Sequence, residues 1–269
     1  MPDGVPAPRL YKIRLYPIKA LDAVEVSEAR IGPKGGFALD RVWAPYASDG
    51  QWIRAKRAPA LHLIRSRFAP DFRSVELIPP AGRTDLLPAQ LSFPGDTAGA
   101  GQWFSRFLGD AVTVRYAEEG FPDDHLAPGP TIVSTASLEA VCSWFPEISL
   151  EQARQRFRAN LEINGVPAFW EDQLFSAEET RSARFRIGEV EFEGSNPCVR
   201  CVVPPRDPST GEPILDFQKR FSQLRRARLP AWSPIARFDH YYRFAVNTRI
   251  AASETGKALR SGDALSLLT

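Results

Sequence analysis

The chain has 269 residues, of which 43% are hydrophobic and 25% are charged, the profile of an ordinary globular protein. Its formal net charge of +2 is too small to indicate a nucleic-acid or membrane surface. Three cysteines cannot build the disulfide framework of a secreted protein, and no apolar run approaches the roughly 20 residues of a membrane span. We therefore expect a cytoplasmic protein of one large domain or two modest ones, with no nucleic-acid or membrane partner.

The first part of the chain consists of short alternating segments typical of β-strands. Leu10–Tyr16 alternates clearly and Val24–Ile31 less so, while Arg41–Pro45 and Gln51–Arg54 predict a hairpin around Asp49-Gly50. Further strands are expected at Leu61–Arg67, Ser74–Pro79 and Ala111–Tyr116, and a short helix at Gln102–Leu108. Glycine and proline recur about every ten residues, which favours a barrel or sandwich over alternating strand and helix.

Gly120–Pro130 is polar and broken by prolines, so we place a domain boundary there, between residues 8–125 and 126–269. Beyond it, Ser134–Ser137 leads into a helix over Leu138–Trp144, and Glu151–Phe157 is also expected to be helical. Strands return at Leu161–Ile163, Arg184–Ile187, Glu189–Glu193, Tyr241–Val246 and Ala264–Leu268, whereas Pro213–Pro234 is expected to be irregular. The sequence thus predicts a mainly β fold with a few helices.

The segment Asn196–Gly211 holds two of the three cysteines, Cys198 and Cys201, with Arg200 between them. It follows a predicted strand and is rich in prolines, which lack the backbone donor that a helix needs, so we expect the thiols on a stiff loop. A cysteine beside an arginine is a candidate thiolate, because a nearby cation favours the charged form. A single thiolate suits a soft metal whose other ligands come from a cofactor.

Simpler interpretations of the two cysteines stay open at this point. A zinc knuckle needs four ligands, and neither Cys142 nor the three histidines (His62, His125 and His240) supply a second knuckle spacing. A thioredoxin-like pair should open a helix, which the downstream prolines oppose. Inert buried thiols are the commonest fate of cysteine.

Several other stretches are candidates for binding an anion. Ser134–Ser137 opens a predicted helix, where unpaired backbone amides and the helix dipole favour negative charge. Lys19 ends the first strand, Arg41 follows an aspartate, Arg54–Arg57 is a positive cluster, and Phe157–Asn160 contains an arginine and an amide. Each also has a plain structural interpretation: a helix N-cap, a solvated lysine, an ion pair, or an exposed strand end.

Taken together, these stretches resemble, in order and spacing, the MOSC (molybdenum cofactor sulfurase C-terminal) domain proteins. The matching segments are Tyr16–Lys19, Leu39–Arg41, Arg54–Pro59, Ser134–Leu138, Phe157–Asn160, Glu171-Asp172, Arg186–Gly188, Cys198–Cys201 and Asp207–Gly211. Cys-x-Arg-Cys followed by Asp-Pro-x-Thr-Gly is the most specific of them. The resemblance implies a β-barrel MOSC domain preceded by an N-terminal MOSC β-barrel domain. Within these proteins, the chain is similar to the amidoxime-reducing component family.

This resemblance implies that the protein binds the molybdenum cofactor, Mo-molybdopterin, with Cys201 as the metal ligand. The residues that would hold the cofactor are Lys19, Arg41, Lys56, Ser134, Thr135, Ser137, Arg158, Asn160 and Arg200. Asp172 is a candidate proton relay, with a structural carboxylate pairing an arginine as its alternative. The chain departs from the family pattern in having Ala20 where a serine is common, Lys56 where an arginine is common, and Val203-Pro204-Pro205 after the thiol pair.

The function implied by the resemblance is a molybdenum-cofactor-dependent oxidoreductase that reduces small N-hydroxylated compounds. The sequence carries no iron–sulfur cysteines, so electrons must come from a separate donor protein or reductase. It also carries no pyridoxal-dependent sulfurase domain. We expect a monomer. An alternative of another class is a cofactor carrier or sulfur-transfer protein without reductase activity. A nucleic-acid-binding barrel using Arg220–Arg228 is a weaker alternative, since the net charge gives it little support.

Overall fold

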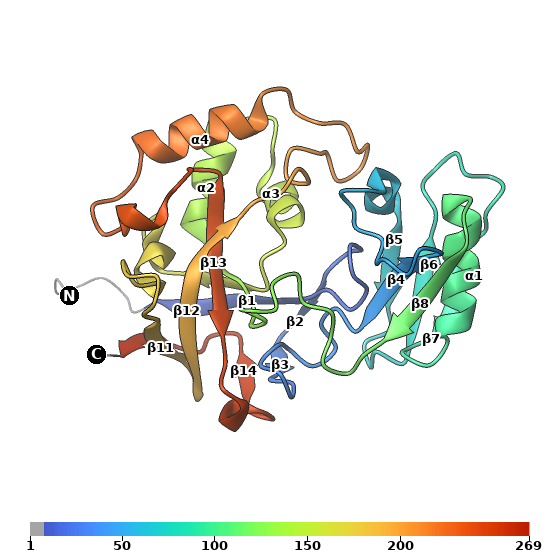
Figure 1. The fold of residues 1–269 in the computed structure, drawn as a ribbon, viewed down its shortest axis with the longest axis horizontal. Coiled ribbons are helices and arrows are strands. Elements are labelled where there is room, and N and C mark those ends of the chain that lie inside the picture. The colour runs from blue at the N-terminus through green and yellow to red at the C-terminus, as the bar shows by residue number, and fades with distance from the viewer. Residues whose placement is uncertain (1–7, 269) are drawn as a thin grey trace.

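Two β-rich lobes make up the structure, a computed structural model that describes residues 8–268 (Figure 1). The larger lobe is built on an eight-stranded sheet and contains three of the four α-helices. In sheet order its strands are β15 (Leu265–Leu268), β11 (Ala183–Ile187), β12 (Val190–Val199), β13 (Arg243–Arg249), β9 (Ile132–Ser134), β10 (Leu161–Asn164), β1 (Arg9–Leu15) and β2 (Val24–Val26).

The large sheet curls until its distant strands meet, as expected for a barrel. The backbone nitrogen of Leu265 in β15 donates to the carbonyl of Pro8, and that of Leu10 in β1 donates to the carbonyl of Asp263, both at 2.8 Å. A further two-stranded ladder joins β3 (Glu28–Arg30) to β14 (Ala258–Arg260). Closure of this kind leaves fewer unpaired strand edges.

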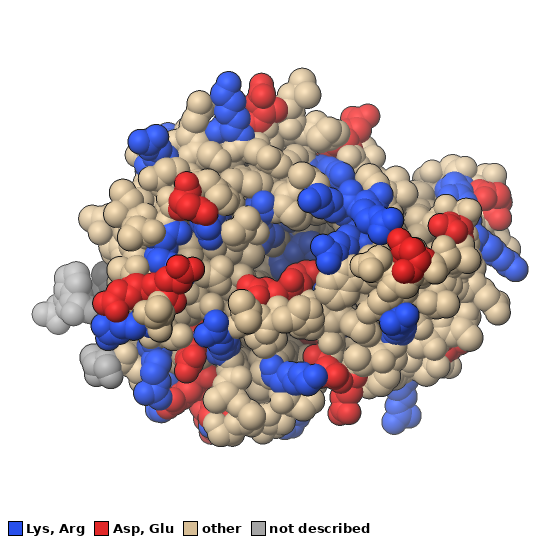
Figure 2. Space-filling model, viewed as in Figure 1, with Lys and Arg blue, Asp and Glu red and all other residues tan. Residues whose placement is uncertain are grey.

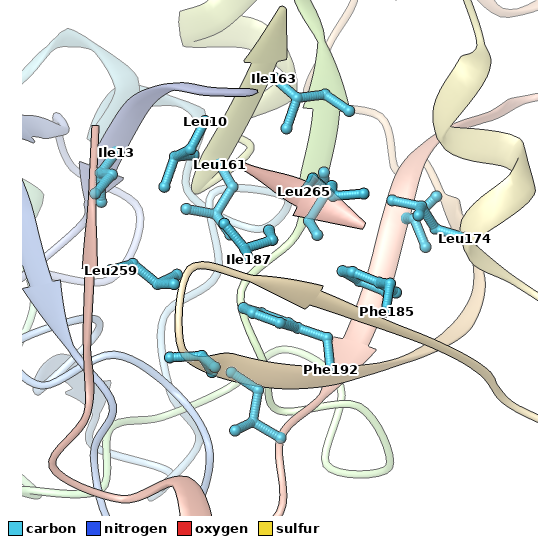
Figure 3. Close-up of a cluster of buried hydrophobic side chains, with 14 of the residues drawn as sticks. Leu10, Ile13, Leu161, Ile163, Leu174, Phe185, Ile187, Phe192, Leu259 and Leu265 are labelled. Carbon is cyan, nitrogen blue, oxygen red and sulfur yellow. The ribbon is translucent and has the colours of Figure 1, made fainter. Parts of the chain in front are cut away.

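The interior of the barrel is filled by aliphatic and aromatic side chains from strands far apart in the sequence (Figure 3). Leu10 and Ile13 come from β1, Leu161 from β10, and Phe185 and Phe192 from the β11–β12 hairpin; all five are almost fully buried. The two phenylalanine rings stack with their centroids 5.2 Å apart. Burying each such side chain stabilises the fold by about 1.5–3 kcal/mol.

The smaller lobe has its own hydrophobic core, centred on Trp43 and Phe104. Its elements are β4 (Trp43–Ala47), η1 (Pro59–Leu63), β5 (Arg65–Phe68), β6 (Ser74–Ile78), β7 (Ala89–Ser92), α1 (Thr97–Leu108) and β8 (Val112–Tyr116). Helix α1 begins after Asp96, whose side chain accepts a hydrogen bond from the Gly99 backbone nitrogen, and it ends at Gly109 in a left-handed conformation.

Three helices cover the outside of the barrel: α2 (Thr135–Trp144), α3 (Leu150–Phe157) and α4 (Phe217–Ala227). Their apolar faces share a core with β13, in which the rings of Phe157, Phe221 and Phe244 pack together. The remaining single turns are η2 (Trp170–Leu174), η3 (Ile235–Arg237) and η4 (Ala252–Glu254). None of the helices between residues 8 and 268 is long and apolar enough to cross a membrane.

The prediction of a mainly β fold with a few helices is confirmed, but several elements differ from those expected. β4 pairs with β8, and the predicted hairpin partner is reduced to a single bridge between Tyr46 and Trp52. Pro59–Leu63 is a short 3-10 helix in place of the start of a strand. Pro213–Pro234, predicted to be irregular, contains α4, because Phe217 and Phe221 lie one helical turn apart and both face the core.

β12 also runs further than predicted, to Val199, and so includes Cys198. Pro197 is accommodated because the pairing of β12 with β13 shifts register on both sides of it. Strand pairing moreover crosses the predicted division at residues 125 and 126. β1, β2 and β3 precede that division, yet they pair with each other or with β10 and β14 of the larger lobe.

Candidate functional site

Basic side chains gather in a hollow between the two lobes (Figure 2). Four of the predicted cofactor-binding residues are brought together here. Two of them lie against the ring of Tyr16, just after β1, and Asp123 lies near both Lys19 and Arg41. The Cζ atoms of Arg41 and Arg158 lie 5.3 Å and 4.1 Å from the ring centroid. Lys19 is three residues further along the chain, and Asn160 accepts a hydrogen bond from Arg41 at 3.3 Å. We call Lys19, Arg41, Arg158 and Asn160 the cationic cluster.

The backbone at the cationic cluster adopts conformations that are uncommon for residues with side chains. Arg41 and Arg158 have φ angles of 54° and 52°, and Ala20 and Leu39 have φ angles of 74° and 67°. Arg158 is the C-cap of α3 and turns the chain sharply from the helix toward β10. Left-handed residues other than glycine need support from their surroundings, and they concentrate at functional sites.

Asn160 ties the cluster to the barrel from a fully buried position, with 2% of its surface exposed. Its Nδ2 donates to the carbonyl of Arg14 at 3.0 Å, while its Oδ1 also accepts from the backbone nitrogen of Thr131 at 3.4 Å. Every polar atom of its amide is therefore used. This contact set holds β1 and β9 at fixed positions beside Arg41.

Two of the three cations in the cluster are already paired with carboxylates. Arg41 forms an ion pair with Asp40, and the Nζ of Lys19 lies 2.6 Å from Asp123 and 2.7 Å from the carbonyl oxygen of Phe121. The ammonium of Lys19 also lies 4.0 Å from the ring centroid of Trp52. Burial lowers the pKa of Lys19, and the Asp123 charge opposes that shift.

Arg158 differs from the other two cations, because within residues 8–268 no carboxylate lies at ion-pair distance from it. Its Nη1 donates to the carbonyl of Leu21 at 2.6 Å. Burial is the main cause that lowers the pKa of Arg158, and the neighbouring charge of Arg41 lowers it further. The guanidinium stays charged at neutral pH because its ordinary pKa is above 12.

The thiol pair lies at the end of β12, anchored to the last turn of α3. Arg200 donates to the carbonyl of Phe157, and its backbone nitrogen donates to the carbonyl of Tyr242 at 3.1 Å. Three residues after Cys201, the Pro204 carbonyl accepts from the Nη1 of Arg156 at 3.0 Å. The loop that carries Cys201 is thus held by the end of α3, and the next residue, Arg158, belongs to the cationic cluster.

The three cysteines are free, and Cys201 is the exposed one. Cys198 is half-buried, and its Sγ accepts a hydrogen bond from the Nη1 of Arg200 at 3.2 Å. The guanidinium of Arg200 therefore contacts the other thiol rather than that of Cys201. Among residues 8–268, no group of three or more histidine, cysteine or acidic side chains is placed to hold a metal ion. A metal on Cys201 would draw its remaining ligands from a cofactor.

The hydroxyl residues at the start of α2 are turned away from the cationic cluster. Ser134 and Ser137 are fully buried and bond to each other through their hydroxyls at 2.7 Å, and Ser134 caps the helix. Thr135 donates to Glu162 at 2.8 Å. In the parallel pair of β9 and β10, Ser134 is opposite Ile163, about 10 Å along the strand from Asn160. The structure thus gives these residues capping and packing contacts rather than a place in the hollow.

Asp172 is buried and bonded to both Arg225 and Ser233, the arrangement expected of a structural carboxylate. Burial raises its pKa, and the charge of Arg225 lowers it. None of these contacts reaches the cationic cluster. Lys56 is exposed on a turn of the smaller lobe, next to Ala55, whose carbonyl accepts from Arg206 at 2.8 Å.

Sequence reasoning missed several residues that shape the hollow, notably Tyr16, Trp52 and Asp123. Tyr16 had a signal, since it opens the motif that ends in Lys19. Asp123 had none, because it belongs to the proline-broken segment interpreted as a domain boundary. Its carboxylate is 74% exposed and lies near both Lys19 and Arg41, the second at 3.9 Å.

The residues present fit a phosphorylated pterin cofactor with a metal. The exposed thiol of Cys201 follows Arg200, which is bonded to the Phe157 carbonyl next to Arg158. The Nε of Arg200 and the Nε1 of Trp52, whose ring lies against Lys19, are buried without a hydrogen-bond partner. Buried donors without partners are costly, so a ligand that accepts from them is favoured. Thiolate, guanidinium and ammonium groups together match a soft metal and an oxyanion.

Comparison with known proteins agrees with this chemistry. The model of the MOSC domain matches residues 130–266, about half of the chain, and that of the MOSC N-terminal beta barrel domain matches residues 7–111. The mitochondrial amidoxime reducing component 2 of Rattus norvegicus is 25% identical over 257 residues, covering 81% of this chain and 72% of that protein.

Two further relatives extend the comparison. The mitochondrial amidoxime-reducing component 1 of Mus musculus is 27% identical over 290 residues, covering 94% of this chain and 80% of that protein. The molybdenum cofactor sulfurase of Danio rerio is 25% identical over 264 residues, covering 82% of this chain but only 31% of that protein. With both of its lobes matched by family models, this chain belongs to the MOSC domain family.

Proposed function

We propose that this protein is a molybdenum-cofactor-dependent oxidoreductase that reduces N-hydroxylated compounds with electrons from a separate protein. The observation that carries the proposal is the anchoring of the Cys201 loop on the last turn of α3, which also supplies Arg158 to the cationic cluster. In this proposal, that anchoring sets the thiol of Cys201 beside the cationic hollow. The names of two of the relatives refer to amidoxime reduction, and the third refers to the molybdenum cofactor.

In this proposal, Cys201 holds the metal and the cationic cluster holds the anionic end of the pterin. When bound, the cofactor supplies a metal that exchanges two electrons and has a coordination position for the substrate oxygen. Arg41 and Arg158 offer planar guanidinium groups, which suit a phosphate or a pterin edge. Asn160 keeps Arg41 in place through its Oδ1 at 3.3 Å. Arg200 holds Cys198 and the carbonyl of Phe157, so it positions the loop that carries Cys201.

The reaction needs two electrons and two protons to convert an N–OH group into N–H and water. Cys201 is exposed, so a small substrate reaches it from the surface. Protons can arrive from solvent by the same route. Electrons require a donor protein that approaches this face, because the sequence provides no second redox centre.

The test is reduction of benzamidoxime by purified protein loaded with cofactor and supplied with a chemical reductant. We expect turnover in the wild type and in Cys142→Ser, a matched control whose half-buried thiol lies on α2. Cys201→Ala should lose turnover and bound molybdenum together. Full molybdenum occupancy without turnover would retire the reductase proposal.

A carrier or sulfur-transfer protein is the second candidate, favoured by one observation: Cys201 is exposed at the surface, where another protein could reach it. In that case loaded protein should release its cofactor to an apo-enzyme, or accept a persulfide on Cys201, and it should show no reductase turnover. Metal analysis of donor and acceptor after mixing separates the two functions.

A further inference from the structure

A cavity of about 50 Å³ lies between the two lobes beside the cationic cluster, with which it shares Arg158 and the ring of Tyr16. One wall comes from α3 and includes Arg154 and Arg158, and the other comes from the end of η1 and the start of β5, with His62 and Arg65. Lys19, Arg41 and Cys201 do not line it. The volume corresponds to about three or four water-sized positions, so it suits a group of a few heavy atoms.

The arginines that line this cavity are neutralised, with one exception. Arg14 lies 3.1 Å from Glu151, Arg65 lies 2.7 Å from Asp22, and Arg154 lies 2.8 Å from Glu162. Arg158 has no such partner among residues 8–268, and it uses only Nη1 in a hydrogen bond, to a carbonyl. A guanidinium has five N–H donors, so most of those on Arg158 make no hydrogen bond to the protein and are available to a ligand.

His62 provides a second group without a partner. Its Nε2 is buried and has no hydrogen bond, and its carbonyl is held by Arg65 at 3.0 Å. Burial, together with the positive charges of Arg158, Arg206 and Arg65, lowers the pKa of His62 to about 4. At neutral pH the imidazole is therefore uncharged and can donate one N–H.

We propose that this cavity is a subsite for a small oxyanion, a phosphate or carboxylate group, bound between Arg158 and His62. An oxyanion accepts from the free donors of Arg158 and from the Nε2 of His62, and its charge offsets the positive charges that act on the imidazole. Two carboxylates, Asp22 and Glu151, also line the cavity, but they are paired with Arg65 and Arg14 and not with Arg158. An oxyanion on Arg158 therefore displaces no carboxylate, whereas one on Lys19 or Arg41 would have to displace Asp123 or Asp40.

The subsite itself does not depend on the proposed reductase function, but the identity of its ligand does. In a reductase, the oxyanion belongs either to the cofactor or to the substrate, so the subsite would select a phosphorylated cofactor or an N-hydroxylated substrate that carries a negative charge. Both sources present the same chemistry to Arg158 and His62.

The first experiment titrates inorganic phosphate into the full-length protein in a cationic buffer and follows the histidine ring signals by NMR. Only three histidines contribute, and His62→Gln assigns the relevant signal. We expect saturating phosphate to raise the pKa of His62 by one unit or more, with His125 and His240 unchanged. Arg158→Gln should abolish that phosphate effect. An unchanged His62, or equal shifts in all three histidines, would overturn the subsite.

The second experiment identifies the source of the oxyanion in the loaded enzyme, with His62→Gln checked for native circular dichroism. If the substrate supplies it, His62→Gln should lower the kcat/KM ratio of 4-carboxybenzamidoxime to benzamidoxime at least five-fold. If the cofactor supplies it, His62→Gln should lower cofactor content and leave that ratio unchanged. If His62→Gln keeps the wild-type cofactor content and the wild-type kcat/KM ratio, the subsite binds neither the cofactor nor the substrate. Phosphate binding without any reductase turnover would instead leave the subsite standing and remove the proposed function.

Discussion

Asp123 sets the electrostatics of the hollow from a loop that sequence patterns assign to a boundary. Burial opposes its ionisation, but the charges of Lys19 and Arg41 lower its pKa. It is therefore a carboxylate at neutral pH, 2.6 Å from the ammonium of Lys19. Any anion that binds Lys19 competes with Asp123, because the carbonyl of Phe121 and the ring of Trp52 occupy the other sides of the ammonium.

We expect Asp123→Asn to increase cofactor occupancy when cofactor is limiting. Removing the exposed carboxylate of this pair changes the binding free energy by about 1 kcal/mol, or roughly five-fold in affinity. Molybdenum and pterin content after loading measures the change. Asp124→Asn is the matched control, since Asp124 bonds instead to Leu126 and Asn247. A lower occupancy in Asp123→Asn would mean that the carboxylate contacts donors of the cofactor.

His62 makes the stability of the protein depend on pH. Its pKa is about 4 in the folded protein and 6.5 in the unfolded chain, so between these values the unfolded chain binds more protons. Stability is therefore present at neutral pH and is lost as the pH falls from 6.5 toward 4. The full shift corresponds to a ceiling of about 3 kcal/mol, and screening of a partly exposed ring reduces this to about half.

The corresponding measurement is urea unfolding of wild type and His62→Gln at pH 7 and at pH 5. We expect the wild type to lose about 1 kcal/mol more than the variant over that interval, because glutamine does not titrate. Equal losses would show that the imidazole does not carry this dependence.

Among the secondary-structure elements, the start of helix α2 offers a test of whether Ser134 caps the helix or binds the cofactor. Its hydroxyl accepts from the backbone nitrogen of Ser137 at 3.1 Å, which satisfies one of the free donors at the helix start. We expect Ser134→Ala to lower the free energy of unfolding by about 1–2 kcal/mol with no change in cofactor content. Ser149→Ala, which removes the exposed N-cap of α3, is the comparison. A folded Ser134→Ala with reduced cofactor content would restore the binding role.

The elements that sequence patterns predicted best are those whose burial alternates along the strand, such as β6 and β11. β12 was underestimated because Pro197 normally ends a strand, and only pairing with β13 through two register shifts allows it to continue. Helix α4 was missed because its arginines mask the apolar spacing of Phe217 and Phe221. These outcomes are decided by tertiary contacts, which local patterns do not contain.

The same limit applies to the candidate site. Lys19, Arg41 and Arg158 could be found because they lie in motifs with fixed order. The structure places Arg41 and Arg158 against the Tyr16 ring and Lys19 against the Trp52 ring. Asp123 and His62 could not be found, since nothing in their local sequence shows that the chain returns to the hollow there. The requirement for glycine at position 194 could not be predicted either. A Cβ there would lie 1.4 Å from the carbonyl oxygen of Leu174, which belongs to a distant segment of the chain.

In the molecule as a whole, the two lobes are not consecutive in sequence, because the chain starts in the barrel, forms the smaller lobe and then returns to the barrel. β1 pairs with β10 and places Leu10, Ile13 and Leu15 in the barrel core, although it precedes the smaller lobe in sequence. By contrast, the core of the smaller lobe draws only on residues between Ile18 and Val114. The barrel is thus assembled from both ends of the chain, with the smaller lobe inserted between them.

We therefore expect a fragment of residues 126–269 to fail to fold alone, whereas a fragment of residues 16–118 should unfold cooperatively. The first fragment lacks β1, β2 and β3, so β10 and β14 lose strand partners. The barrel core also loses six buried hydrophobic side chains, of which the five larger than alanine are each worth about 1.5–3 kcal/mol. Fusing residues 8–38 to it through a flexible linker should restore a cooperative urea transition and native circular dichroism. Cooperative unfolding of residues 126–269 without that segment would show that the barrel closes without β1, and the hollow would then be a junction between two independent domains.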